Sequence, residues 1–266
     1  MRTRSFMTIV LAIGMVLTVT GVARADLQDG LISYWSFDET SGTTVADGFG
    51  VNDGTASGAY DLNVSGKIGS GIDFSGGQVL VGSVGISGNA DRTIAGWFHS
   101  DLTDPPGDWR GIYGFYKTTG GNGEFFGVDV INNDDVGIHI YGFEEPLADL
   151  EISSWHYVVA TYDSSANRIY TSYDGAAMVE RTPSQTVNTS DLFMMGFRPD
   201  QNNDFDGQVD EVGVWNRALN GAEVTELWNG GAGNYFLDDG TLLGNAAGRG
   251  DVGGTWAGGV PGGGTG

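Results

Sequence analysis

Cysteine is absent from this 266-residue chain, which excludes stabilising disulfides and the cysteine-linked lipid anchor of bacterial lipoproteins. Basic residues are also scarce, because 12 lysines and arginines stand against 34 acidic residues and give a formal net charge of −22. A chain this acidic lacks the positive surface that attracts nucleic acids or anionic membranes. We therefore expect no nucleic-acid partner, and stability must come from a sizeable apolar core.

Proline is rare, with 6 residues, and apolar residues at helical spacing are almost missing. Glycine, by contrast, is abundant at 46 residues and recurs between short runs of β-branched and aromatic residues. This pattern is typical of many short strands joined by tight turns. One segment departs from it: residues 220–230 space Val224, Leu227 and Trp228 along one face, which predicts a short helix that stops at Gly230.

The first 25 residues have the three parts of a secretory signal. Arg2 and Arg4 precede an apolar run at 6–19, and an Ala-Arg-Ala sequence ends at Ala25. An uncleaved membrane anchor is the alternative, but the run is short for a bilayer and no second apolar stretch follows it. We expect an exported chain that begins at Asp26, is secreted or held at the cell surface, and does not insert into the membrane.

The mature chain divides into one domain and one tail. Residues 26–236 have the length and pattern of a single all-β domain. Residues 237–266 are rich in glycine and poor in apolar side chains, which is typical of a flexible linker. Within the domain, the strand-like segments contain Trp35, Trp97, Trp155 and Trp215, and we expect all four indoles in the core.

Several segments, taken in chain order, carry a family resemblance. They are Tyr-Trp-Ser-Phe-Asp-Glu at 34–39, Gly-Ile-Asp-Phe-Ser-Gly at 71–76, Thr-Ile-Ala-Gly-Trp-Phe at 93–98, Trp-His-Tyr-Val-Val-Ala-Thr-Tyr-Asp at 155–163 and Gly-Gln-Val-Asp-Glu-Val-Gly-Val-Trp-Asn-Arg-Ala-Leu at 207–219. Over residues 29–230 the chain resembles the laminin-G-like jelly-roll domains of secreted bacterial proteins, within the concanavalin A-like lectin and glucanase superfamily. The resemblance implies a two-sheet antiparallel jelly-roll sandwich whose first and last strands lie side by side.

The resemblance also implies a structural calcium ion between the loop after the first strand and the last strand. The matching positions are Asp47, Asn52 and Asp210. Carboxylate, amide and carbonyl oxygens are suitable calcium ligands, and glycine-rich loops can turn carbonyls inward. The alternative is that Asp47 and Asn52 cap tight turns in the loop at 47–54.

Glycan binding needs aromatic faces for sugar rings and polar groups for hydroxyls. Trp109 and Tyr116 are candidates for the aromatic platform, with Arg110 and Asn202 as polar neighbours. Trp109 follows a turn-rich segment at 105–108, which places it at the rim of the sandwich. The alternative is that these aromatic residues belong to the core, where large aromatic side chains are often buried.

Catalysis has less support in the sequence. The Glu-x-Asp-x-x-Glu strand motif that the resemblance to glucanases would require is absent. The carboxylates at 144–151 are interrupted by Pro146 and are expected in a solvated loop. We therefore predict a secreted, non-catalytic module that binds carbohydrate or a glycoconjugate. An adhesive or spacer domain of a cell-surface protein is the first alternative, and a glycoside hydrolase is the second.

Overall fold

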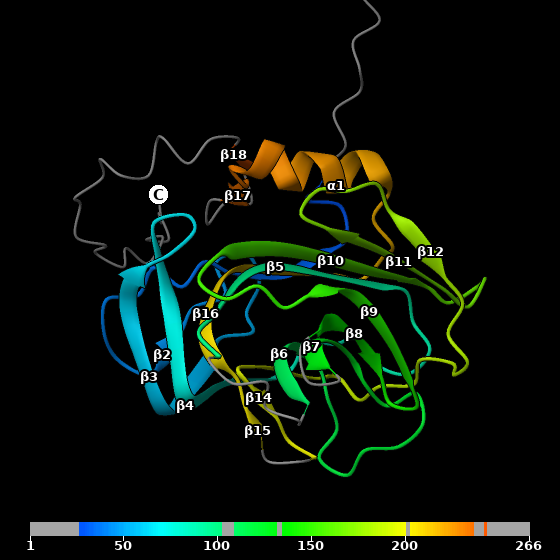
Figure 1. The fold of residues 1–266 in the computed structure, drawn as a ribbon, viewed down its shortest axis with the longest axis horizontal. Coiled ribbons are helices and arrows are strands. Elements are labelled where there is room, and N and C mark those ends of the chain that lie inside the picture. Colours follow the sequence, from blue (N-terminus) through cyan, green and yellow to red (C-terminus); the bar gives the residue numbers. More distant parts are fainter. Residues whose placement is uncertain (1–26, 103–108, 132–134, 201–202, 237–241, 244–266) are drawn as a thin grey trace, which may run out of the picture.

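The computed structural model describes residues 27–102, 109–131, 135–200, 203–236 and 242–243. Antiparallel strands curl into two facing layers, and the one α-helix of these residues is short and lies outside the layers (Figure 1). The all-β jelly-roll prediction is confirmed. The predicted signal segment at 1–25 and most of the predicted tail lie outside the described residues.

The strands are mostly short, as the glycine-punctuated sequence predicts. Their bounds are β1 (Leu31–Trp35), β2 (Thr44–Val45), β3 (Gly54–Ser65), β4 (Ser70–Ser83), β5 (Arg92–Ser100), β6 (Arg110–Phe115), β7 (Phe126–Ile131), β8 (Asp135–Ile140), β9 (Phe143–Asp149), β10 (Trp155–Asp163), β11 (Arg168–Tyr173), β12 (Val179–Arg181), β13 (Leu192–Met195), β14 (Phe197–Arg198), β15 (Asn203–Asp204), β16 (Asp206–Trp215), β17 (Tyr235–Phe236) and β18 (Leu242–Leu243). β3, β4 and β16 are longer, with 12, 14 and 10 residues. β17 and β18 pair with each other, so the predicted tail includes one short paired strand.

The strands are hydrogen-bonded in the order β12-β11-β10-β5-β16-β4-β13-β6-β7-β8-β9. The first strand pairs with the last long one, since Leu31 lies opposite Trp215 and Trp35 opposite Val212. This adjacency was predicted from the sequence. It joins the two ends of the domain across 180 residues of chain and protects an edge of β16 from solvent.

β4 carries the chain from one layer to the other. Its first half pairs with β16, where Phe74 lies opposite Gly207, and its second half pairs with β13, where Leu80 lies opposite Met194. Gly76 stands between the two halves at φ 115°. A side chain would strain this backbone, so glycine permits the bend that makes one continuous sheet into a sandwich.

The main core fills the space between the layers. Trp35 stacks on Phe193 with ring centroids 5.3 Å apart, and Phe115 meets Phe193 edge to face. Three of the four tryptophans predicted in the core, Trp35, Trp97 and Trp215, are at most 1% exposed. Trp155 is only half-buried, because it stands at the first position of β10, where the sandwich ends.

Helix α1 (Gly221–Trp228) confirms the predicted helix and covers the outer face of the β5 and β10 layer (Figure 1). Asn220 caps its first turn, and Glu223 completes a capping box. Val224 and Leu227 pack into a second apolar cluster with Trp97. A 3-10 turn, η1 (Asn229–Gly231), follows. Neither helical element of the described residues has the length or apolar character to span a membrane.

Two local features add detail to the prediction. Asp174 and Gly175 turn the chain between β11 and β12 with φ values of 47° and 71°, as a type I′ hairpin requires. The segment 144–151 was expected in a solvated loop, but its first six residues, 144–149, belong to the edge strand β9. Pro146 is compatible with this strand because an edge position leaves one side of the backbone without a ladder partner.

Candidate functional site

Strands β7 and β8 place polar side chains on the outer face of their layer. Val128 and Ile138 point into the core, so the alternation along each strand turns Asp129 and His139 the other way. Gly137 lies opposite Asp129, and Gly127 lies opposite His139. The two polar residues are therefore diagonal neighbours, with glycines beside them that leave room for larger side chains.

Asp129, His139 and Tyr116 form a buried hydrogen-bonded group. Asp129 Oδ2 is 2.9 Å from His139 Nδ1, and the Tyr116 hydroxyl donates to Asp129 Oδ1. Burial, and then the charge of Asp129, raise the pKa of Tyr116 well above its usual value. The phenol therefore stays protonated and serves as a donor to the carboxylate. A Cβ at Gly127 would lie 2.4 Å from the Tyr116 hydroxyl oxygen, so this glycine provides the space that the tyrosine occupies.

Arg198, from β14, extends this group. Its Nε is 2.7 Å from Asp200 Oδ1 and its Nη2 is 3.2 Å from Asp200 Oδ2, a two-point pairing. Its Nη1 lies 3.7 Å from Asp129 Oδ2. Burial acts to lower the pKa of Arg198, but hydrogen bonding to Asp200 and the charges of both carboxylates outweigh burial and raise it. The guanidinium remains charged although the side chain is 2% exposed.

Half-buried aromatic side chains lie over this buried group. The Trp109 ring is 5.0 Å from the Arg198 guanidinium and lies parallel to the His139 ring at 6.3 Å. Tyr141 and Phe197 are also half-buried and pack against the buried Tyr116 and Phe125. The arrangement is a partly exposed aromatic surface on a rigid, charged support.

Polar groups border the aromatic surface. Glu144 Oε1 is 3.9 Å from His139 Nε2, and Asn203 donates its amide to the Trp109 carbonyl oxygen at 3.1 Å. Asp200 and Arg110 are half-buried at the same end, and Arg110 donates to the Asp204 carbonyl oxygen. We call the surface formed by Trp109, Tyr141, Phe197, Glu144, Asp200 and Asn203 the aromatic surface.

The four residues predicted to bind ligand have separate outcomes. Trp109 is half-buried near the rim, and Arg110 lies next to it. Tyr116 is completely buried, so it supports the surface from behind and does not contribute an exposed ring. Asn202 lies outside the described residues. The sequence reasoning missed Asp129, His139 and Arg198, although a lone polar residue between the apolar neighbours of a strand is a signal that could have identified the first two.

The residues predicted to bind calcium make other contacts. Asp47 Oδ1 accepts from the backbone N–H groups of Tyr34, Phe49 and Gly50, and Oδ2 accepts from that of Asn52, at 2.8–3.1 Å. Asn52 donates its side-chain amide to Ser33 at 2.7 Å. These bonds fit the turn-capping alternative.

Asp210 lies on β16, and its Oδ2 accepts from the backbone N–H of Ile68 at 2.9 Å. Nowhere in the described ranges do three acidic or histidine side chains come together as metal ligands do. This donor set does not by itself make a calcium cage, which takes six to eight oxygens. Calcium at Asp47, Asn52 and Asp210 stays a prediction.

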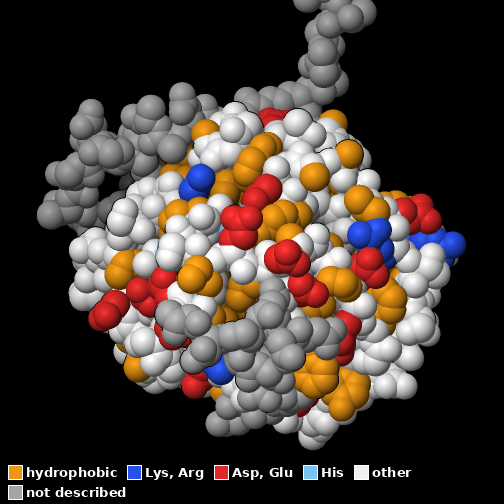
Figure 2. Space-filling view, in the orientation of Figure 1, with side chains coloured by type: hydrophobic (Ala, Val, Ile, Leu, Met, Phe, Trp, Pro, Cys, Tyr) orange, Lys and Arg blue, Asp and Glu red, His pale blue; other side chains and the backbone are white. Residues whose placement is uncertain are grey.

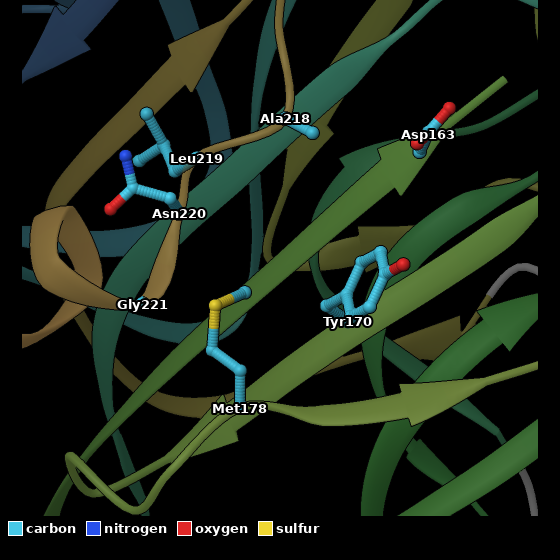
Figure 3. Close-up of a pocket in the computed structure, with 7 residues that line it drawn as sticks. All are labelled: Asp163, Tyr170, Met178, Ala218, Leu219, Asn220 and Gly221. Carbon is cyan, nitrogen blue, oxygen red and sulfur yellow. The ribbon is translucent and has the colours of Figure 1, made fainter. Parts of the chain in front are cut away.

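A pocket of about 420 Å³ lies elsewhere, between β10, β11 and the segment before α1 (Figure 3). Met178 and Leu219 line it together with Tyr170 from β11. Its polar groups take part in local turns, since Asn220 caps α1 and Asp163 accepts from the Ser165 and Ala166 backbone. The pocket therefore lacks the converging polar groups of a specific ligand site.

Sequence comparison places the fold in a family. The model of the concanavalin A-like lectin/glucanases superfamily matches residues 69–225, more than half of the chain. The chain belongs to this superfamily. A search of curated proteins found no match. Within the superfamily, fold alone does not select a function.

Solved structures with the same fold are distant in sequence. Trypanosoma rangeli sialidase is 18% identical with a TM-score of 0.57, over 75% of this chain and 32% of the sialidase. Domain 4 of AbnA, a GH43 extracellular arabinanase from Geobacillus stearothermophilus, in complex with arabinotriose, is 16% identical with a TM-score of 0.54, over 73% and 96%. The binding domain of Paraclostridial Mosquitocidal Protein 1 is 13% identical with a TM-score of 0.58, over 76% and 52%. The chain thus spans about a third of the sialidase.

Proposed function

We propose that this protein is a secreted carbohydrate-binding module without hydrolytic activity, and that the glycan binds at the aromatic surface. The observation that carries the proposal is the half-buried Trp109, which packs on the buried Arg198 and His139. The half-buried Tyr141 lies on the same His139 ring, at 6.2 Å. Apolar faces of sugar rings stack on aromatic rings, and nearby polar atoms bind the hydroxyls.

The buried group gives the surface its rigidity. Arg198 is held by two bonds to Asp200, and it lies within 5.0 Å of Trp109 and 5.4 Å of Phe125. An aromatic side chain that is already fixed loses little conformational freedom when a ligand binds, which favours affinity. The signal-like segment at 1–25 supports an extracellular location, where glycans are exposed.

The names of the structural neighbours support a carbohydrate role. The AbnA domain is described in complex with arabinotriose. A Trypanosoma rangeli sialidase is described in complex with sialic acid, but this chain matches 32% of that protein, which says nothing of where its sialic acid binds. The AbnA domain is matched over 96% of its length, so the comparison there concerns a whole domain of similar size. The sequence identities to these neighbours are low, so the neighbours support the proposal in combination with the aromatic surface.

Hydrolysis has weaker support. A retaining glycosidase needs two carboxyl groups about 5 Å apart on either side of the scissile bond. Asp129 is completely buried and bonded to Tyr116 and His139, and the Asp200 carboxylate is paired with Arg198. Asp129 is therefore closed off from a bound glycan, and Asp200 is held in an ion pair with Arg198.

A glycan array read together with a hydrolysis assay on the same polysaccharides tests this proposal. We expect binding to at least one glycan and no release of reducing ends. Turnover would assign the protein to the glycoside hydrolases. Absence of both binding and turnover, with the protein folded, would favour the adhesive or spacer alternative.

A further inference from the structure

We infer that the glycan bound by the aromatic surface is uncharged, and that sugars carrying carboxylate or sulfate groups are disfavoured. This inference rests on the proposed function and specifies its ligand class. It follows from the contacts of the basic side chains around the surface and from the hydrogen-bonding character of the groups that border it.

Arg198 packs against Trp109 and is almost fully buried, so a ligand anion cannot reach it. Asp200 occupies the Nε and Nη2 edge at 2.7 and 3.2 Å, while Nη1 is buried and lies toward Asp129. Trp109 and Phe125 are both near the guanidinium, at 5.0 and 5.4 Å. With 2% of the side chain exposed, its charge is already balanced inside the protein.

The other nearby cations are also engaged. Lys117 forms an ion pair with Glu124. Arg110 is half-buried and donates to the Asp204 carbonyl oxygen, in a segment that also contains the Asp200 and Asp204 carboxylates. Neither side chain forms the open, two-point fork that selects a sugar carboxylate.

The side chains bordering the surface are mainly acceptors. Glu144 and Asp200 are half-buried there, and ionised carboxylates accept hydrogen bonds but cannot donate them. Sugar hydroxyl groups can donate to these oxygens, whereas a carboxylate group on a sugar offers only further acceptors. Because Arg198 already balances Asp200, the repulsion of such a group comes mainly from Glu144. The electrostatic potential of the whole chain also disfavours an anionic sugar, because the formal net charge is −22 and acidic side chains recur across the face in Figure 2.

The test uses an array that carries each glycan in matched forms, with and without one anionic group, followed by titration calorimetry on the pair that binds. The wild-type protein should prefer the neutral form by roughly tenfold or more, as expected when like charges approach with limited screening. Equal or tighter binding of the anionic form would overturn the inference and leave the proposed function standing. No binding to any glycan would overturn both.

Two variants test whether the pairing of Arg198 with Asp200 sets the preference for neutral glycans. Asp200→Asn removes the charge that neutralises Arg198, so affinity for the anionic form should rise relative to the neutral form by about tenfold. Asp29→Asn removes one negative charge from an exposed ion pair with Arg217 beside α1, on the other layer of the sandwich, and should leave the preference unchanged. Equal shifts in both folded variants would show that overall charge, and not Arg198, sets the preference. If Asp200→Asn does not fold, the wild-type comparison alone decides the inference.

Discussion

The buried carboxylate of Asp129 should be essential to the stability of the site. It accepts from the Tyr116 hydroxyl, lies 2.9 Å from His139 Nδ1 and lies 3.7 Å from Arg198 Nη1. Asp129→Ala removes two buried hydrogen bonds and leaves a positive charge with only one carboxylate partner. Two stranded buried donors at about 1–3 kcal/mol each give a loss of about 2–6 kcal/mol. Removing one partner of a buried charged group costs about 3–5 kcal/mol. The two figures describe the same lost contacts and are not added, so we expect a loss of roughly 3–5 kcal/mol.

Asp129→Asn provides the matched control. The amide keeps the shape and one acceptor oxygen for Tyr116, but it loses the charge that attracts Arg198, so we expect a smaller loss of roughly 1–2 kcal/mol. Urea unfolding followed by tryptophan fluorescence measures both, provided the m-values agree with that of the wild type. If Asp129→Ala unfolds within about 0.5 kcal/mol of the wild type, the buried group does not stabilise the site and the reasoning is wrong.

Three further predictions concern the rest of the domain. Trp97→Ala should lower the free energy of unfolding in urea by about 3–5 kcal/mol because the indole is fully buried, whereas Trp155→Ala, at a half-buried position, should lower it clearly less. Equal losses would contradict the burial assignments. If Asp47 acts only as a turn cap, Asp47→Ala should lower the melting temperature alike in calcium and in EDTA, because it removes the acceptor of four backbone N–H groups. A destabilisation seen only in calcium would instead support the predicted calcium site. Burial raises the pKa of Glu39, so the folded state holds its proton more tightly than the unfolded state, and wild-type stability falls as pH rises through the raised value. Glu39→Gln should be as stable as the wild type at about pH 3.5, below the usual glutamate pKa, and more stable at pH 7. A constant difference in unfolding free energy across this range would refute the assignment.

Features determined by local chemistry were predictable from the sequence. The Asn220 and Glu223 pair marks the start of α1 because it satisfies the first backbone N–H groups of the helix. Asp174 and Gly175 mark the β11 to β12 turn because both tolerate positive φ. The pairing of β1 with β16 followed from the family resemblance and not from any local pattern.

The candidate site was only partly predictable because it depends on register. β6 and β7 shift register between Gly111 and Tyr113, so that Ile112 and Tyr113 both join the main core. Tyr116, three positions after Tyr113, lies on the other face and is also buried. Asp129 and His139 meet only because β7 and β8 pair in one particular register. Arg198 comes from a strand far along the chain, and nothing in the sequence connects it to Asp129.

The most direct test of the central claim is the affinity of Trp109→Ala for the glycan identified on the array. Tyr170→Ala is the control, because Tyr170 is a half-buried aromatic residue in the separate pocket near α1. If the glycan stacks at the aromatic surface, Trp109→Ala should remain folded and bind about tenfold or more weakly, while Tyr170→Ala should bind like the wild type. Unchanged affinity in a folded Trp109→Ala protein would contradict the account and place the glycan elsewhere on the domain.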